Sequence, residues 1–202
     1  MRATVKICNI VLAMLFLILS LFACTDRNNT HLLPGDNKNS FIIPYLGLKY
    51  TLPDKGGHWL VAQQNLTSSN IYFCAVDTLT NECVTIVHPG NLNSGDRELT
   101  RHEVNVLIND LIKNPDLATE KFSVAHQEIR KCKYLDLDAF KFDVNLEIER
   151  GSDKMSIKYC GYFFLLKEKI IGIMLISPAH LLENSDEEQI QNIFYNLTLA
   201  NS

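Results

Sequence analysis

The stretch FKFDVNLEIE, residues 140–149, alternates strictly between apolar and polar side chains. Because successive side chains of a β-strand point to opposite faces, this alternation predicts a strand with one buried face and one face in water. The stretches YCGYFFLL (159–166) and IIGIMLI (170–176) are apolar at both parities. Strands of that kind must be covered on both faces, so we expect these two near the centre of a sheet.

Earlier apolar runs predict further strands. We expect a bent first strand over 41–52, a second strand over 59–63, and a hairpin that joins 71–76 to 83–88. The links between these runs are short, which suits antiparallel pairing. Most of the chain is therefore expected to form an antiparallel sheet.

Two helices are predicted by capping signals that precede one-sided apolar stripes. Thr100 and Glu103 form a capping box, and apolar side chains then recur at helical spacing over 104–112. Near the C-terminus, Ser185 caps a second helix whose apolar stripe ends at Leu197. The order of strands, helix, strands and helix predicts an α+β fold, a mainly antiparallel sheet with helices covering both faces.

The N-terminal residues predict export. Arg2 and Lys6 precede the uncharged run 10–23, which is shorter than the ~20 residues of a membrane-crossing helix. The next feature, LFAC at 21–24, resembles the lipobox of bacterial lipoproteins, in which the chain is cut before the cysteine and the thiol is acylated. That resemblance implies a lipid on Cys24. The alternatives are an uncleaved anchor helix and an ordinary secreted protein.

The lipobox divides the chain into three parts. We expect a signal peptide over 1–23, the lipidated Cys24 with a flexible tether that ends at residue 40, and one α+β domain over 41–202. The tether is rich in Asn, Asp, Gly and Pro and lacks periodicity. Thr25, directly after the lipidated position, favours the outer membrane of the bacterial envelope over the inner membrane.

A second resemblance concerns the domain itself. The stretch GLKYTLP (47–53), followed by Trp59, resembles the opening of PsbP-like domains, in which a strand ends in Pro and a Trp follows. That family includes the DcrB-type envelope lipoproteins, and the likeness extends over about residues 41–199 in the order of elements. It implies an α/β/α sandwich and a binding or accessory role, because the fold is mostly used without chemistry. A likeness of fold implies no particular ligand.

Four cysteines follow Cys24. Cys74 and Cys83 are symmetrical about a turn at 78–79, and this register places them directly opposite, with Cβ atoms ~4.5–5.5 Å apart. In an oxidising envelope they could form a disulfide; two free thiols, or a register shifted by one residue, are the alternatives. Cys132 and Cys160 are expected on strands that are not neighbours, as small buried hydrophobes or as a second bridge.

The sequence lacks the common motifs of metal sites and of nucleophilic catalysis. It contains no C-x-x-C, H-E-x-x-H or G-x-S-x-G pattern, so we expect no metal, no cofactor and no catalytic residue. Tyr50 and Trp59 could line a binding groove or pack in the core. The acid-rich alternation of Asp143, Glu147 and Glu149 could bind a cation or a basic partner, or form a solvated face.

The composition of the chain limits the classes of partner that it can bind. The net charge of −4 at pH 7 argues against nucleic acid, which attracts clustered Lys and Arg, and leaves membrane attachment to the lipid on Cys24. We therefore expect a non-catalytic, lipid-anchored envelope protein that binds another protein or belongs to an envelope complex. The main alternative is an immunity-type lipoprotein that neutralises a toxin. An enzyme and a small-ligand binder are the remaining alternatives.

Overall fold

The computed structural model describes residues 33–35, 39–53, 58–61, 70–91, 98–112, 121–150, 153–183 and 187–200. The elements are β1 (Leu33–Pro34), β2 (Ser40–Ile43), β3 (Leu48–Thr51), β4 (Trp59–Val61), β5 (Ile71–Asp77), β6 (Cys83–Asn91), α2 (Arg101–Ile112), β7 (Lys121–Tyr134), β8 (Leu137–Arg150), β9 (Asp153–Leu166), β10 (Lys169–Pro178), α3 (Ala179–Glu183), α4 (Glu187–Tyr195) and β11 (Leu197–Leu199). The predicted signal peptide and Cys24 lie outside the described residues.

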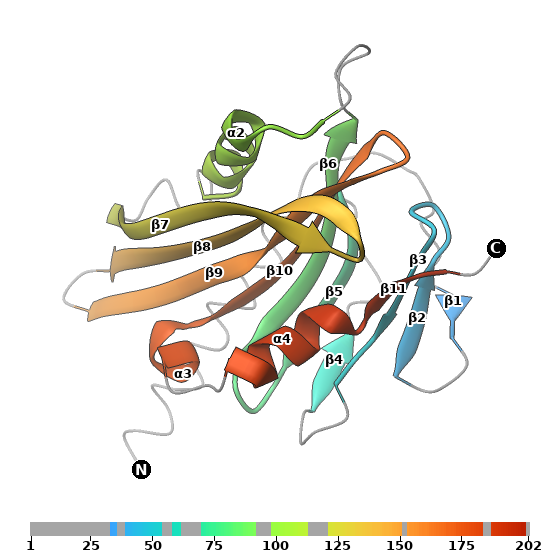
Figure 1. Ribbon diagram of the computed structural model, residues 1–202. Helices are drawn as coiled ribbons and strands as arrows, with labels where there is room; N and C mark the ends of the chain where they lie inside the picture. Colours follow the sequence, from blue (N-terminus) through green and yellow to red (C-terminus); the bar gives the residue numbers. More distant parts are fainter. Residues whose placement is uncertain are drawn as a thin grey trace.

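A seven-stranded antiparallel sheet runs through the molecule in the order β4-β5-β6-β10-β9-β8-β7 (Figure 1). The prediction that 159–166 and 170–176 lie centrally is confirmed, because β9 and β10 are inner strands with partners on both sides. The alternating stretch 140–149 lies in β8, with its apolar side chains buried. Glycine permits close packing between the central strands. A Cβ on Gly172 would lie 2.6 Å from the ring of Phe163.

A second, four-stranded sheet has the order β1-β2-β3-β11. The predicted bent strand over 41–52 is in fact a hairpin of β2 and β3, because the chain reverses between Pro44 and Gly47 and Gly47 adopts a left-handed φ of 65°. Leu197, predicted as the end of the last helix, begins β11 and pairs with Tyr50. Strand β1 pairs with β2, so part of the predicted tether belongs to this sheet.

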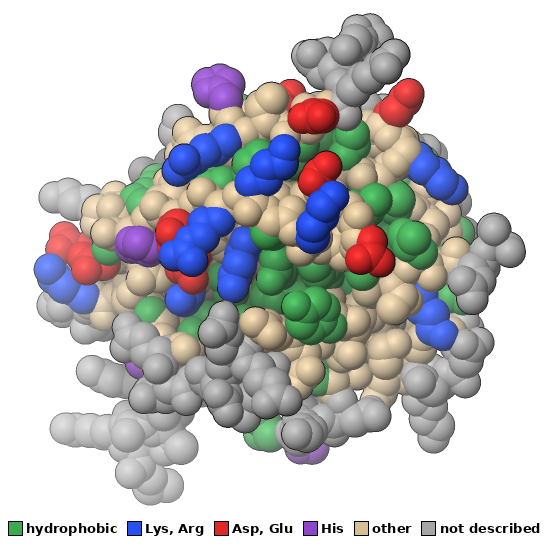
Figure 2. Space-filling model, in the orientation of Figure 1, with side chains coloured by type: hydrophobic (Ala, Val, Ile, Leu, Met, Phe, Trp, Pro, Cys, Tyr) green, Lys and Arg blue, Asp and Glu red, His purple; other side chains and the backbone are tan. Residues whose placement is uncertain are grey.

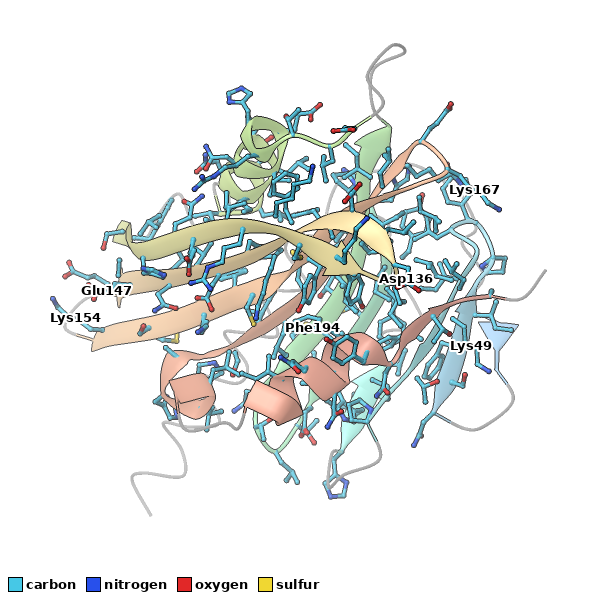
Figure 3. All side chains as sticks on the ribbon, in the orientation of Figure 1. Lys49, Asp136, Glu147, Lys154, Lys167 and Phe194 are labelled. Carbon is cyan, nitrogen blue, oxygen red and sulfur yellow. The ribbon has the colours of Figure 1, made fainter. Side chains whose placement is uncertain are left out.

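Two hydrophobic cores lie on opposite faces of the seven-stranded sheet. The inter-sheet core fills the space between the two sheets and includes side chains from α3 and α4, among them Leu48, Tyr50, Phe73, Ile173 and Phe194. In Figure 3, Phe194 extends from α4 beside the seven-stranded sheet. The α2-side core lies beneath α2 and includes Val104, Ile108, Phe142, Phe163 and Met174.

The predicted fold class, an α+β sheet with helices on both faces, is wrong. Strands hold 63% of the described residues, and the three described helices are short. On the inter-sheet side the second sheet provides much of the cover, through residues such as Leu48 and Tyr50. The sequence suggested otherwise because the strands of this sheet are short and the one at the C-terminus continues a helical spacing of apolar residues. The fold is β-rich.

The helix signals themselves were reliable at α2. The prediction of a capping box is confirmed: the Glu103 amide donates to Thr100 Oγ1 at 3.2 Å, and the Thr100 amide donates to Glu103 Oε2 at 2.7 Å. Val104, Ile108 and Ile112 are buried against the sheet. Within the described part of the chain, no helix combines the length and the apolar character needed to cross a membrane.

An aromatic clamp joins the two sheets at one end. The Tyr45 ring, from the turn between β2 and β3, stacks on Tyr72 of β5 with centroids 5.2 Å apart. Lys169 Nζ lies 3.6 Å from the centroid of the Tyr45 ring and donates to the Tyr45 carbonyl at 2.6 Å. Tyr45 is thus held by a ring and by a cation, which fixes the second sheet against the first.

Candidate functional site

Strand β7 forms the long free edge of the seven-stranded sheet (Figure 1). It is 14 residues long and pairs with β8, and among the described residues no strand pairs with its other side. The opposite edge, β4, has only 3 residues. The ladder is irregular between Val124 and His126, and from Gln127 to Tyr134 its register is unbroken. An edge of this length exposes main-chain donors and acceptors.

Ion pairs organise the side chains along this edge. Arg130 donates two hydrogen bonds to Glu128, at 2.5 and 2.7 Å, and Lys133 lies 3.0 Å from Asp138. The pKa of Glu128 is lowered, mainly by the hydrogen bond from Arg130. The pKa of Asp138 is lowered by the hydrogen bond from Lys133 and, to a smaller degree, by the charge of Lys131.

Positive charge exceeds negative charge on the strand itself. We call the three cations in the second half of β7 the basic edge: Arg130, Lys131 and Lys133. The carboxylate on this part of the strand is Glu128, so β7 is positive although the whole chain carries −4; Asp136 and Asp138 follow in the turn and in β8. In the part of the chain that the structure describes, no ion pair involves Lys131. Figure 2 shows Lys and Arg side chains gathered over β7 and its neighbours.

A shallow hollow of about 180 Å³ adjoins the basic edge. It lies where the segment that leads into α2 approaches β7, β8 and β9. Its lining combines an apolar set with a charged set, namely Leu99, Phe140 and Leu165 with Glu98, Lys131 and Asp138. Such a hollow has the size and lining to receive a single apolar side chain while polar groups of the same partner meet the charged rim.

The acid-rich face of β8 is largely neutralised. Asp143 pairs with Lys158 at 2.8 Å, and Glu149 pairs with Lys154 at 2.9 Å. Figure 3 shows Glu147 and Lys154 near one another at the far end of β8 and β9. These pairs match a solvated sheet face better than a cation site. No group of three or more His, Cys, Asp or Glu side chains in the described ranges is arranged to hold a metal ion.

Cys74 and Cys83 lie close together, but the predicted register is wrong. Cys74 pairs with Thr85 and Cys83 pairs with Val76, so the hairpin is displaced by two residues from the predicted alignment. A displacement of two keeps both thiols on one face, and their sulfur atoms are 3.6 Å apart. Both side chains are buried and unbridged. The disulfide therefore stays a prediction.

The two thiols differ in acidity. The hydrogen bond with Cys83 lowers the pKa of Cys74, whereas the same bond and complete burial raise the pKa of Cys83 above its usual range. The Thr85 hydroxyl lies 3.4 Å from the Cys83 sulfur. Cys132 and Cys160 lie on β7 and β9 with β8 between them, as expected of strands that are not neighbours.

The predicted binding residues Tyr50 and Trp59 lie apart from the basic edge. Tyr50 is fully buried in β3, where its hydroxyl donates to the Ile193 carbonyl at 3.1 Å and burial raises its pKa. Trp59 lies in β4, partly buried against the inter-sheet core. A binding role for this pair stays a prediction. The sequence did contain one signal for the basic edge, the run RKCK at 130–133.

Comparison with known proteins identifies the fold. No protein-family model and no curated protein sequence matches the chain. The solution structure of the cyanobacterial PsbP protein CyanoP, from Synechocystis sp. PCC 6803, is similar with a TM-score of 0.54 at 10% identity, covering 88% of this chain and 97% of CyanoP. The Ran-binding protein Mog1p of Saccharomyces cerevisiae gives 0.48 at 10% identity, covering 77% and 91%. The chain therefore resembles CyanoP in fold, as the resemblance to PsbP-like domains implied.

Proposed function

We propose that this chain is a non-catalytic, lipid-anchored protein of the bacterial cell envelope that binds a partner protein through the basic edge. The observation that carries the proposal is the positive charge of β7, a long edge strand on an acidic chain, beside a hollow with a mixed apolar and charged lining. The fold likeness to CyanoP supports an accessory role only by analogy.

Electrostatics indicates what kind of partner fits. The acidic remainder of the chain repels acidic partners, so the basic edge is the part of the described surface where such a partner is attracted. Charge of this kind raises the association rate and sets the orientation of docking, and salt weakens both effects. The apolar part of the hollow, Leu99, Phe140 and Leu165, adds a contact that salt does not weaken.

A photo-crosslinking amino acid tests the surface in living cells. We place it at Asp138, which lines the hollow beside the basic edge, and, as a matched control, at Leu79 in the turn between β5 and β6, because both side chains are exposed. We expect a reproducible adduct with one protein at Asp138 and not at Leu79. The adduct should disappear when Lys131→Glu and Lys133→Glu are added. Equal adducts at both positions, or an adduct that survives the charge reversal, would contradict the proposal.

The lipid anchor needs its own experiment. Cells are fed an alkyne fatty acid, and labelling is compared among the wild type, Cys24→Ala and the control Cys8→Ala. Only Cys24→Ala should lose the label and be released from membranes, because the lipobox places the acylated thiol at that position. Several acyl chains hold a protein on a bilayer where one chain is marginal. Undiminished labelling of Cys24→Ala would rule out the lipoprotein assignment.

A further inference from the structure

We infer that the β7 edge binds an extended, acidic segment of the partner as an additional strand of the seven-stranded sheet. This inference rests on the proposed function and specifies its partner chemistry. An added strand derives its affinity from main-chain hydrogen bonds and its selectivity from side chains at alternating positions. Both contributions can be traced to described residues of β7.

The main-chain contribution comes from the second half of β7. From Gln127 to Tyr134 each residue pairs in unbroken register with β8, so the backbone here is regular and extended. Within the described ranges, the side of β7 away from β8 has no strand partner. The irregularity at Val124 and His126 interrupts the first half, because a bulge bends an edge and disturbs its pairing. The receptive stretch is therefore 127–134.

Charge decides between the two obvious occupants of such an edge. A second copy of this chain, paired edge to edge, would set the cations of one β7 against those of the other, and like charges on paired strands are destabilising. Lysine on an edge strand is a common protection against that association. The same cations attract an acidic strand. The edge therefore disfavours pairing with a second copy of β7 and favours an acidic segment of a partner.

The positions of the cations predict the pattern of the segment. Lys131 and Lys133 have the same parity, and Lys131 lines the hollow on the α2 side of the sheet; Arg130 has the other parity and faces the opposite side. An added strand would therefore meet one cation on each face: Lys131, which has no ion pair among the described residues, and Arg130, which is paired with Glu128. We expect adjacent acidic residues in the segment, followed on the Lys131 side by an apolar residue that enters the hollow and contacts its apolar lining of Leu99, Phe140 and Leu165.

Peptide binding to the full chain, purified in detergent micelles, tests the inference. The probe is a fluorescent nine-residue peptide of Val and Thr with two adjacent central Glu residues and one Leu. Two comparison peptides carry Lys in place of Glu, or N-methyl groups on alternate amides. We expect the acidic peptide to bind at least about tenfold more tightly than either. Amides of 127–134 should exchange hydrogen more slowly when it is bound.

Matched charge reversals locate the binding. Lys131→Glu with Lys133→Glu should weaken binding of the acidic peptide by about tenfold or more. The control is Lys167→Glu with Lys154→Glu: Lys154 is ion-paired and exposed as Lys133 is, and both control residues lie away from the basic edge. Circular dichroism confirms that each variant is folded. The control should bind the peptide nearly as the wild type does.

Each outcome has one meaning. Equal affinity for the N-methylated peptide would overturn strand addition, and equal affinity for the Lys peptide would overturn acidic selectivity. If the crosslinker at position 138 captures a partner in cells but no acidic peptide binds, the proposed function stands and this inference fails. If the peptide binds but the crosslinker at position 138 captures nothing, the edge is receptive and the proposed function fails.

Discussion

The central strands β9 and β10 and the edge strand β7 belong to the same sheet but have different surroundings. β10 lies between β6 and β9, with the inter-sheet core on one face and the α2-side core on the other. β7 has β8 on one side and, among the described residues, no strand on the other. Charged side chains alternate along it with a few buried ones.

Because of this difference, we expect the central strands to determine the stability of the protein and β7 to determine its binding. Burial of apolar surface is the main favourable term in folding, and here it is concentrated in the central strands. The edge contributes less burial but keeps main-chain groups and charges accessible. Substitutions in the centre should therefore unfold the protein, whereas substitutions on β7 should change binding at almost constant stability.

The largest expected effect is at Phe163 in β9. Its ring is fully buried and stacks on Phe142 with centroids 5.2 Å apart. Phe163→Ala should lower the free energy of unfolding by about 3–5 kcal/mol, since it removes apolar contact and leaves a cavity. The control Val124→Ala on β7 should change it by less than about 1 kcal/mol. Urea denaturation measures both, and equal losses would refute the separation of the two regions.

A disulfide between Cys74 and Cys83 would add to the stability of the β5–β6 hairpin, which pairs with the central strand β10 through β6. Closing this hairpin loop would contribute about 2–3 kcal/mol in the chain-entropy model. The sulfur atoms must move from 3.6 Å to a bonded distance of about 2.0 Å, which requires a small adjustment of the strands. Alkylation without reductant, followed by peptide mass mapping of exported protein, decides the matter. Recovery of two alkylated thiols would end the prediction.

The aromatic clamp should contribute less. Tyr45→Ala removes a ring that stacks on Tyr72 and contacts the Lys169 ammonium group. We expect a loss of about 1–2 kcal/mol in the free energy of unfolding. Tyr195→Ala serves as the control, because Tyr195 is 59% exposed and Tyr45 is 53% exposed. Thermal unfolding compares them. Similar melting temperatures for the two variants would show that the clamp does not secure the second sheet.

Local patterns predicted the central region well. The strands at 140–149, 159–166 and 170–176 and the helix after Thr100 follow from periodicity and capping, which depend only on nearby residues. Their central position also followed, because apolar side chains at both parities require cover on both faces. In these cases the pattern of apolar residues that is visible in the sequence is also what stabilises the strand or helix.

Features that depend on distant residues were missed. β11 looked helical because Leu197 continues the apolar spacing of α4, yet its partner in β3 is far away in the chain. The hairpin register was missed by two residues because Asp77 accepts a hydrogen bond from the Leu79 amide and the Asp77 amide donates to the Glu82 carbonyl, which lengthens the turn. The free edge was missed because strand order is a property of the whole sheet.

The smallest expected effects are two pH dependences of opposite sign. Burial raises the pKa of Glu82, in the turn between β5 and β6, above 4.5, whereas the hydrogen bond from Arg130 lowers the pKa of Glu128 on β7. Glu82→Gln should therefore increase the melting temperature at neutral pH, and this gain should vanish as the pH falls through the raised pKa to below 4.5. Glu128→Gln should decrease it at neutral pH, and this loss should vanish as the pH falls through the lowered pKa.

Melting curves of the wild type and both variants between neutral and acid pH measure these differences. The glutamine at position 82 removes the charge and keeps an oxygen that can accept the hydrogen bond from Thr80. A partly buried carboxylate destabilises the folded state because it loses hydration, and a paired surface carboxylate stabilises it modestly. If both variants shifted in the same direction at neutral pH, Glu82 and Glu128 would not have the different environments that separate the central region from the edge.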